Sequence, residues 1–421
     1  LYLTATGRND WASQIAGSPS KSFFYPSVGL SWVPSSTWDL GNAFSYLKLR
    51  GSIASVGLPF PRFLTTPTYE YDATGKIWKD KTHYPIGDLK PERTITYEVG
   101  IDARLWKNIS LSASWYSADT KNQTFDPALP PSSSYTTIYL QTGHVRNTGV
   151  ELSLGYSNQW RDFGWSSNFT FSWNKNEIID LASGALNPVT GQPLNLSELD
   201  IKGLGKAKYI LKQGGTLGDL YTTSDLKFND NGYVEVDKAG NLLLTDEGDQ
   251  IYLGSVFPSE NLAWRNDFRY KGINLGLLFT GRIGGICYSA TQANMDLYGV
   301  SEVSAAARDA GGVLINGREM VDAQKWYQAI GSQSGLPQYY TYSATNFRLQ
   351  ELSLGYTLPR KWFRNKMGLT VSFVGRNLWM IYCKAPFDPE AVASTGLSYQ
   401  GIDYFMMPSL RSLGFNVKFE F

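Results

Sequence analysis

The chain has 421 residues, of which 38 are Lys or Arg and 37 are Asp or Glu, so its formal net charge is +1. This balance gives no electrostatic basis for binding nucleic acid, because a polyanion attracts proteins with a clear excess of cations. The mean hydropathy is −0.26, and no apolar run approaches the ~18 residues of a membrane-spanning helix.

Alternation of apolar and polar residues predicts about twelve β-strands, because successive side chains in a strand point to opposite faces. No low-complexity linker divides the chain, so we expect one large architecture rather than several small domains. The expected strands cover residues 1–7, 22–34, 45–57, 93–106, 108–120, 143–158, 163–176, 259–271, 273–286, 344–358, 367–380 and 407–421.

The segment 93–106 indicates which kind of β-protein this is. Apolar residues from Ile95 to Leu105 alternate with Glu98, Asp102 and Arg104, so three charged groups share one face of one strand. Neither a sandwich core nor lipid would accept those charges without a large cost. The pattern favours a transmembrane antiparallel β-barrel with lipid outside and water inside, and the 14% aromatic content suits its interfacial girdles. A carbohydrate-binding β-sandwich is the alternative.

The connections between the expected strands alternate in length. Tight turns are expected at 106–108, 159–163, 271–272 and 359–367, and long segments at 58–92, 121–142, 177–258, 287–343 and 381–406. All the long segments fall at one end, which is typical of bacterial outer-membrane barrels with short periplasmic turns. We therefore expect extracellular loops and a periplasmic C-terminus, whereas a Greek-key sandwich spreads long loops over both ends.

Within the long loops, the one helix that the sequence predicts is Val321–Ile330, a surface helix that packs Trp326 onto the loops. The acidic stretch from Asp225 to Asp249 lacks the spacing of a calcium loop, since in a count that starts at Asp237 the third position is Ala239 and the sixth is Leu242. We expect no dedicated metal site and no cofactor.

The cysteines and histidines give no sign of catalysis. Cys287 and Cys383 follow the same end of two different strands, so a disulfide and two free thiols are both open. His83 and His144 lie in no recognisable arrangement with a nucleophile, so we predict no catalytic residues and no enzyme.

Several sequence motifs are spread in order over nearly the whole chain: LYLTATGRNDWAS at the start, FFYPSVGLSW at 23–32, LKPERTITYEVG at 89–100, NTGVELSLGY at 147–156, NFTFSWNKNEIIDL at 168–181, FRLQELSLGYTLP at 347–359, GRNLW at 375–379 and FDPE at 387–390. Together they resemble the motifs of the SusC-like subfamily of TonB-dependent outer-membrane transporters. The loop at 237–249 corresponds to a calcium-like loop in this subfamily but has lost ligands.

The resemblance implies a 22-stranded barrel whose lumen holds an N-terminal plug. Residues 1–421 would then be the C-terminal portion of the barrel, with the plug, the TonB box and the N-terminal strands outside this chain. The implied partners are these remaining strands and the plug, a SusD-like surface lipoprotein, the TonB complex and outer-membrane lipid.

The implied function is TonB-energised import of a glycan or oligopeptide across the bacterial outer membrane. Four loop aromatics near the strand tops are the candidate substrate contacts: Tyr339, Tyr340, Tyr342 and Tyr382. A passive porin-type channel is the first alternative, although loops of this total length argue against an open pore. An outer-membrane barrel enzyme is the second.

Overall fold

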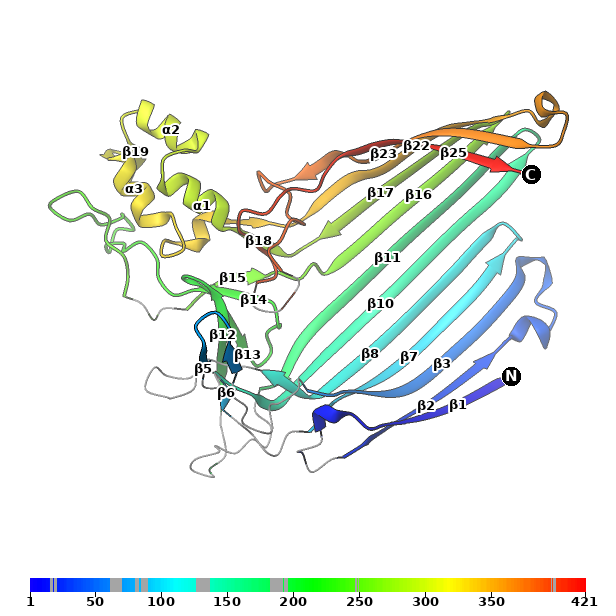
Figure 1. Ribbon diagram of the computed structural model, residues 1–421, viewed down its shortest axis with the longest axis horizontal. Helices are drawn as coiled ribbons and strands as arrows, with labels where there is room; N and C mark the ends of the chain where they lie inside the picture. Colours follow the sequence, from blue (N-terminus) through cyan, green and yellow to red (C-terminus); the bar gives the residue numbers. More distant parts are fainter. Residues whose placement is uncertain are drawn as a thin grey trace.

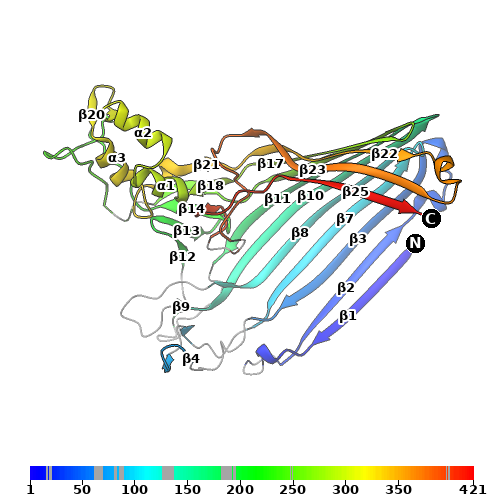
Figure 2. The ribbon, with the colours of Figure 1, turned by 45° about the horizontal axis from the view of Figure 1, so that its top comes forward.

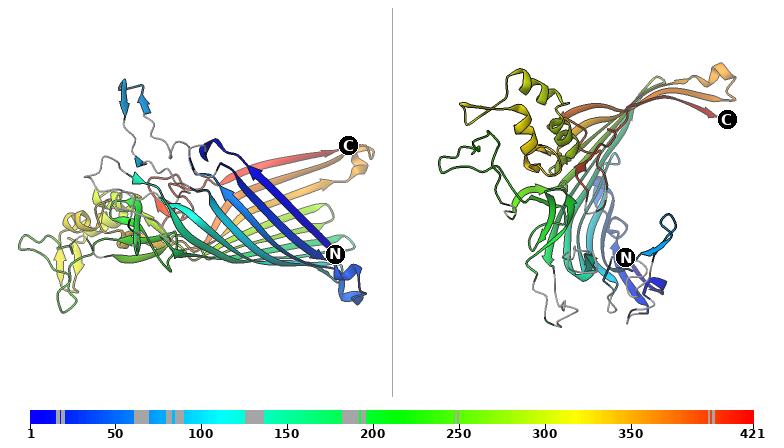
Figure 3. Two further views of the ribbon diagram at one scale, coloured as in Figure 1. Left: turned by 90° about the horizontal axis from the view of Figure 1, so that it is seen from below. Right: turned by 60° about the vertical axis from the view of Figure 1, so that its left-hand side comes forward.

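The computed structural model describes residues 1–15, 18, 21–60, 70–79, 83–84, 90–125, 137–181, 192, 196–246, 248, 250–394, 396 and 399–421. One twelve-stranded antiparallel sheet dominates it, with its strands in chain order (Figure 1). The sheet is curved and open, and β1 and β25 are its two edges (Figures 2 and 3). The strands are β1 (Tyr2–Asp10), β2 (Phe23–Trp32), β3 (Phe44–Leu58), β7 (Glu92–Leu105), β8 (Ile109–Phe125), β10 (Leu140–Trp160), β11 (Phe163–Asp180), β16 (Glu260–Tyr270), β17 (Ile273–Ile283), β22 (Asn346–Leu358), β23 (Gly368–Cys383) and β25 (Ser412–Glu420).

Each of the twelve predicted strands is confirmed, and the main errors are at the strand ends. β8 continues to Phe125, β10 begins at Leu140 and β11 reaches Asp180. These extensions were missed because the alternation of apolar and polar residues is lost there: polar residues occupy both faces of the β8 extension, and Ile178 and Ile179 are adjacent in β11. In the other direction, the last strand begins at Ser412 rather than at residue 407.

The connections divide between the two ends of the sheet as expected. The short ones, 33–43, 106–108, 161–162, 271–272 and 359–367, lie at the end that also holds both termini (Figure 1). In the tightest of them the chain turns through left-handed backbone, as at Lys271 (φ 46°) and Gly272 (φ 89°). A hairpin with positive φ at both turn residues matches the twist of the strands that it joins.

The long connections fold into smaller elements at the opposite end (Figure 1). A four-stranded sheet contains β12 (Glu198–Leu204), β13 (Ala207–Lys212), β14 (Asp219–Thr222) and β15 (Ile251–Ser255), and a three-stranded sheet contains β18 (Ile286–Ser289), β21 (Thr341–Ser343) and β24 (Ile402–Asp403). The two-stranded pairs are β19 (Val313–Ile315) with β20 (Glu319–Val321), β4 (Glu70–Asp72) with β5 (Ile77–Lys79), and β6 (His83–Tyr84) with β9 (Thr137–Ile138).

Three short α-helices accompany these strands in the described residues: α1 (Ala290–Leu297), α2 (Glu302–Asp309) and α3 (Ala323–Ile330). The predicted helix is confirmed as α3, and Trp326 packs against the neighbouring core. The sequence missed α1 and α2, because their apolar residues follow the helical period less closely than those of α3; each begins at a serine cap, Ser289 or Ser301. None of the described helices has the length and apolar content to cross a membrane.

We call the described parts of 198–255 and 286–343, with β24, the loop module. Its core is continuous and includes fully buried residues from both of its sheets and from its helices, among them Tyr209, Leu220, Tyr288, Ala293, Leu336 and Ile402. The long connections that form the loop module therefore pack against one another around a shared hydrophobic core.

The two faces of the main sheet differ in chemistry. We call the face that carries Arg50, Glu98 and Glu151 the inner face, and the opposite one the outer face. On β10 the outer side chains from Val150 to Trp160 are mostly apolar, which matches the ~9–11 residues that a tilted strand needs to cross a bilayer. Rings such as Trp160 and Phe163, stacked 5.9 Å apart, mark the short-turn end of this apolar band.

Polar groups inside the apolar band are paired by indole N–H donors. Asn266 is only 4% exposed, and its side-chain oxygen accepts from Trp165 Nε1 at 3.2 Å. Ser167, directly opposite Asn266 in the register, accepts from Trp264 Nε1 at 3.0 Å. Each pair satisfies a polar atom that hydrocarbon would leave without a partner.

Candidate functional site

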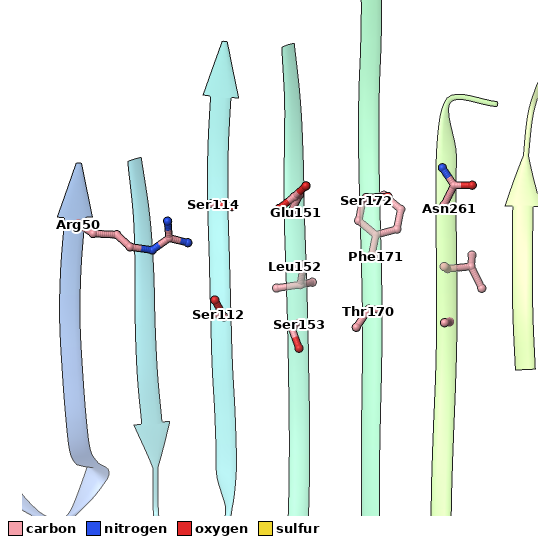
Figure 4. A pocket seen from close by; sticks show the side chains of 12 residues that line it. Arg50, Ser112, Ser114, Glu151, Leu152, Ser153, Thr170, Phe171, Ser172 and Asn261 are labelled. Carbon is pink, nitrogen blue, oxygen red and sulfur yellow. The ribbon is translucent and has the colours of Figure 1, made fainter. Parts of the chain in front are cut away.

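The inner face of the main sheet carries a shallow depression of about 390 Å³. It crosses β3, β8, β10, β11 and β16 (Figure 4). Its polar side chains come from positions that face one another in the register: Arg50, Ser112, Ser114, Glu151, Ser153, Thr170, Ser172 and Asn261. Hydroxyl, amide and charged groups on neighbouring strands give this wall both donors and acceptors for a polar solute.

The side chain of Arg50 on β3 extends over the neighbouring strand β7 at the position of Gly100. Figure 4 shows its side chain reaching from β3 over the neighbouring strand. It forms an ion pair with Glu98, and its Nε lies 3.6 Å from a carboxylate oxygen of Asp102. A Cβ at Gly100 would lie 2.7 Å from the guanidinium carbon, so the absence of a side chain at position 100 makes room for this arrangement. Arg50 is a residue that the sequence analysis did not single out.

Glu151 lies beside this ion-paired group. It is exposed and sits between Ser114 of β8 and Ser172 of β11 in the register. Among the described residues no cation lies within salt-bridge distance of it. Glu98 and Asp102 share Arg50, whereas the Glu151 carboxylate is free to accept hydrogen bonds from a ligand.

A second group of charges spans four strands of the inner face. Arg265 donates to both oxygens of Asp267, at 2.9 and 3.1 Å, and its third nitrogen lies 3.4 Å from Glu351. Glu351 also accepts from Arg376 Nε at 3.0 Å. Leu278 lies between Arg265 and Glu351 in the register, beneath this bridge. Leu278, an apolar residue on the inner side of β17, is thus covered by an ion pair.

A buried ion pair fixes the last loop to the top of the sheet. Arg348 is 2% exposed, and its Nη2 contacts Asp388 at 3.0 Å and Glu390 at 3.1 Å. Burial opposes ionisation of Asp388, but hydrogen bonds from Arg348, Ser409 and the Glu390 backbone outweigh it and lower the pKa of this carboxyl. The FRLQ and FDPE motifs, far apart in sequence, therefore meet in one contact.

A comparison with protein families matches residues 1–378 to the TonB dependent receptor-like β-barrel model. The chain belongs to this family. The twelve-stranded sheet is therefore part of the barrel wall of a TonB-dependent outer-membrane receptor.

The curated relatives are receptors of the same kind. TonB-dependent receptor P3 of Formosa agariphila is 25% identical over 99% of this chain and 44% of its own length. TonB-dependent receptor SusC of Bacteroides thetaiotaomicron is 20% identical over 79% of this chain and 32% of its own length. The chain thus spans less than half of these receptors.

Solved structures show the same fold. The RagAB peptide importer in its closed-closed state superposes with a TM-score of 0.72 at 20% identity, and covers 99% of this chain and 45% of its own. The open-open state of the same importer gives a TM-score of 0.68. The strand order of this receptor chain is therefore that of a TonB-dependent barrel.

The receptor places the four predicted contact tyrosines in different surroundings. Tyr340 is 3% exposed, whereas Tyr339 is 37% exposed and meets Trp326 edge-on at 6.0 Å. Tyr342 packs edge-on against Phe387 at 5.7 Å. Tyr382 pairs with Phe347, whose neighbours Asn346 and Arg348 point to the inner face, so Tyr382 lies on the outer side.

Both cysteines of the receptor are free thiols. Burial raises the pKa of Cys287 to about 12, so its reactive thiolate is scarcely populated at neutral pH. Cys383 is partly buried, and its Sγ lies 3.9 Å from the Phe387 carbonyl oxygen. Of the two states that the sequence left open, the structure shows the unbridged one.

The remaining positions considered from the sequence are the loop at 237–249 and the two histidines. Asp237 accepts from the backbone and side chain of Asn241 and from the Ala239 backbone, and these hydrogen bonds lower its pKa. The described residues contain no group of three His, Cys, Asp or Glu side chains able to hold a metal, and Asp249 lies outside them. His144 pairs with Asp119 at 2.8 Å, and the side chain of His83 lies outside the described residues.

Proposed function

We propose that this chain forms part of the wall and the outer loops of a SusC-like importer that takes up a glycan or an oligopeptide. The observation that supports this most directly is the inner-face depression, in which Glu151 lies among Ser114, Ser172 and Asn261 and has no ion-pair partner in the described part of the chain. Such a surface hydrates a polar oligomer and offers it hydrogen-bond partners without closing around it. The folded loop module next to it provides a second surface for the same solute.

The proposal treats residues 1–421 as the C-terminal portion of the barrel, with the plug, the TonB box and the N-terminal strands outside this chain. The open edges of the sheet, β1 and β25, support this, because each unpaired backbone group in hydrocarbon costs several kcal/mol. The long connections and the loop module would face outward and the short turns would face the periplasm. A SusD-like lipoprotein would meet the loop module, and the TonB complex would act through the plug.

Among the four candidate tyrosines, Tyr339 fits a substrate contact best. Its ring keeps exposed surface at the edge of the loop module, where it is available to stack on a sugar or a peptide side chain. Tyr342 has less free ring surface, and Tyr340 would need a local opening. Tyr382 points to the outer side and would reach only material outside the barrel.

The test is uptake and conductance of the full-length protein. We expect uptake of a labelled oligomer that stops when TonB is absent, together with almost silent conductance in planar bilayers. In Glu151→Gln the carboxylate is lost at constant size, and uptake should fall with no change in surface abundance. Steady TonB-independent flux would favour the passive-pore alternative instead.

A further inference from the structure

Above the apolar band, the outer face of β7, β8, β10 and β11 becomes polar and carries both signs of charge. The register places these residues in parallel rows, and we call the set the outer polar strip: Arg93, Lys121, Asp119, His144, Arg146, Lys175, Glu177 and Asp180. The strip lies in the middle of the sheet, with three strands between it and one edge of the sheet and five strands between it and the other edge. It is therefore a lateral surface that the barrel presents to its surroundings.

Most of the strip's charges already have partners. Asp119 accepts from His144 Nε2 at 2.8 Å and from Arg146 Nε at 2.9 Å. Lys175 pairs with Glu177 at 2.8 Å. These contacts neutralise the β10 and β11 side of the strip.

Two cations remain without a carboxylate partner in the described structure. Arg93 and Lys121 are both exposed and face each other directly across β7 and β8. Arg93 Nε donates to Ser55 Oγ at 2.9 Å, and its terminal nitrogens have no acceptor among the described residues. Like charges directly opposite on one face of a sheet destabilise the pair unless an anion lies between them.

The position of this pair relative to the band identifies the source of the anion. On β7 the outer face is apolar from Leu105 to Ile95, and Arg93 is the next outward residue. The guanidinium therefore lies just beyond the hydrocarbon, at the depth where lipid phosphates are found. A phosphate offers several acceptor oxygens, which suit a guanidinium and an ammonium group together.

We propose that Arg93 and Lys121 form a binding site for the phosphate of an outer-leaflet lipid. The phosphate bridges the two cations and removes their mutual repulsion, so the lipid acts as a structural component of the barrel wall. The assignment to the outer leaflet rests on the orientation proposed above. The binding itself needs neither a solute nor the TonB complex.

The experiment measures lipid binding to the full-length protein in detergent. Diphosphorylated lipid A, phosphatidylglycerol and inorganic phosphate are titrated separately, with thermal unfolding and native mass spectrometry as the readouts. The variants are Lys121→Gln and Arg93→Gln, and the matched control is Lys366→Gln, which removes an exposed lysine at the short-turn end. We expect lipid A to stabilise the wild type more than either other ligand, and Lys121→Gln to weaken this binding about tenfold.

A second arm separates lost binding from lost folding. In lipid-free detergent Lys121→Gln should be at least as stable as the wild type, because it removes one of two opposed like charges. Equal stabilisation by inorganic phosphate or by phosphatidylglycerol, or equal lipid A binding by Lys121→Gln and Lys366→Gln, overturns the proposal. Since uptake is measured separately, failed lipid binding with intact uptake leaves the import function standing.

Discussion

Single side chains decide how the outer face tolerates polar atoms. Asn266 and Ser167 face each other inside the apolar band, and each receives an indole N–H from a tryptophan on the neighbouring strand. An aromatic residue here supplies both apolar surface for lipid and a donor for a group that lipid cannot solvate. Tryptophan cannot be exchanged for phenylalanine at these two positions without consequence.

We expect Trp165→Phe to destabilise the barrel by about 1–3 kcal/mol, because the side-chain oxygen of Asn266 loses its donor while staying buried. Trp264→Phe is the matched comparison, and its effect should be smaller since the Ser167 hydroxyl is free to rotate to another partner. Thermal unfolding of the full-length protein in detergent measures both. Equal losses in the two variants would contradict the role assigned to Asn266.

At the inner face, Gly100→Ala should displace Arg50 from Glu98 and Asp102, because the added Cβ would lie 2.7 Å from the guanidinium carbon. The freed carboxylates would change the charge that a solute meets in the depression. Gly29→Ala is the control, since its Cβ meets only an ordinary contact 3.8 Å away on the same face. We expect altered uptake for Gly100→Ala alone, and equal behaviour of the two variants would argue against a role for Arg50.

At the scale of elements, the contact between β22 and the last loop is held by one buried cation. Arg348→Gln should release the described part of 384–411 from the sheet at a cost of about 3–5 kcal/mol, because Asp388 loses its cation and Glu390 keeps only its longer contact with Arg282. Arg282→Gln removes a half-exposed cation 3.6 Å from Glu390 and should cost at most about 1 kcal/mol. Limited proteolysis of the loop in the full-length protein measures the difference. Similar cleavage of both variants would contradict the prediction.

The same contact predicts a direction of pH dependence. The pKa of Asp388 in the folded protein is lowered from its ordinary value of 3.8. The stabilisation of the docked loop by the Asp388 carboxylate is therefore complete above pH 3.8 and is lost as the pH falls through the lowered pKa. Docking of the loop should therefore be constant from neutral pH down to about 4 and weaken only in stronger acid. Proteolysis by an acid-active protease follows this change, and loosening already near pH 6 would exclude Asp388 as its cause.

The elements that the sequence predicted and those that it missed differ in burial. The long strands have one lipid-facing and one water-facing side, so period-two alternation revealed all twelve. β14 is buried on both faces and β13 nearly so, and neither shows any alternation. The charged inner face was predicted from Glu98 and Asp102. Their partner Arg50 lies on the neighbouring strand β3, and its position opposite them depends on a register that the sequence does not display. The Arg348 contact likewise joins motifs forty residues apart.

At the scale of the whole molecule, the sheet has two long edges, β1 and β25, each hydrogen-bonded on one side only in the described structure. We expect the backbone amides of both strands to be as protected from hydrogen exchange as those of β2 and β23 in the full-length protein, because further strands cover them. In the 421-residue chain alone they should exchange faster, and the chain should self-associate. Rapid exchange of both edges in the full-length protein would contradict the proposed placement in a larger barrel.

The ion-paired chain from Asp267 to Arg376 has a consequence for transit. Each charged side chain in this group contacts one of opposite sign, so the inner face at this level carries little local net charge. In the importer proposed above, an oligomer passing this part of the wall would be hydrated without meeting an unpaired charge that could hold it strongly. Stronger binding would be confined to positions such as Glu151, which has no ion-pair partner among the described residues.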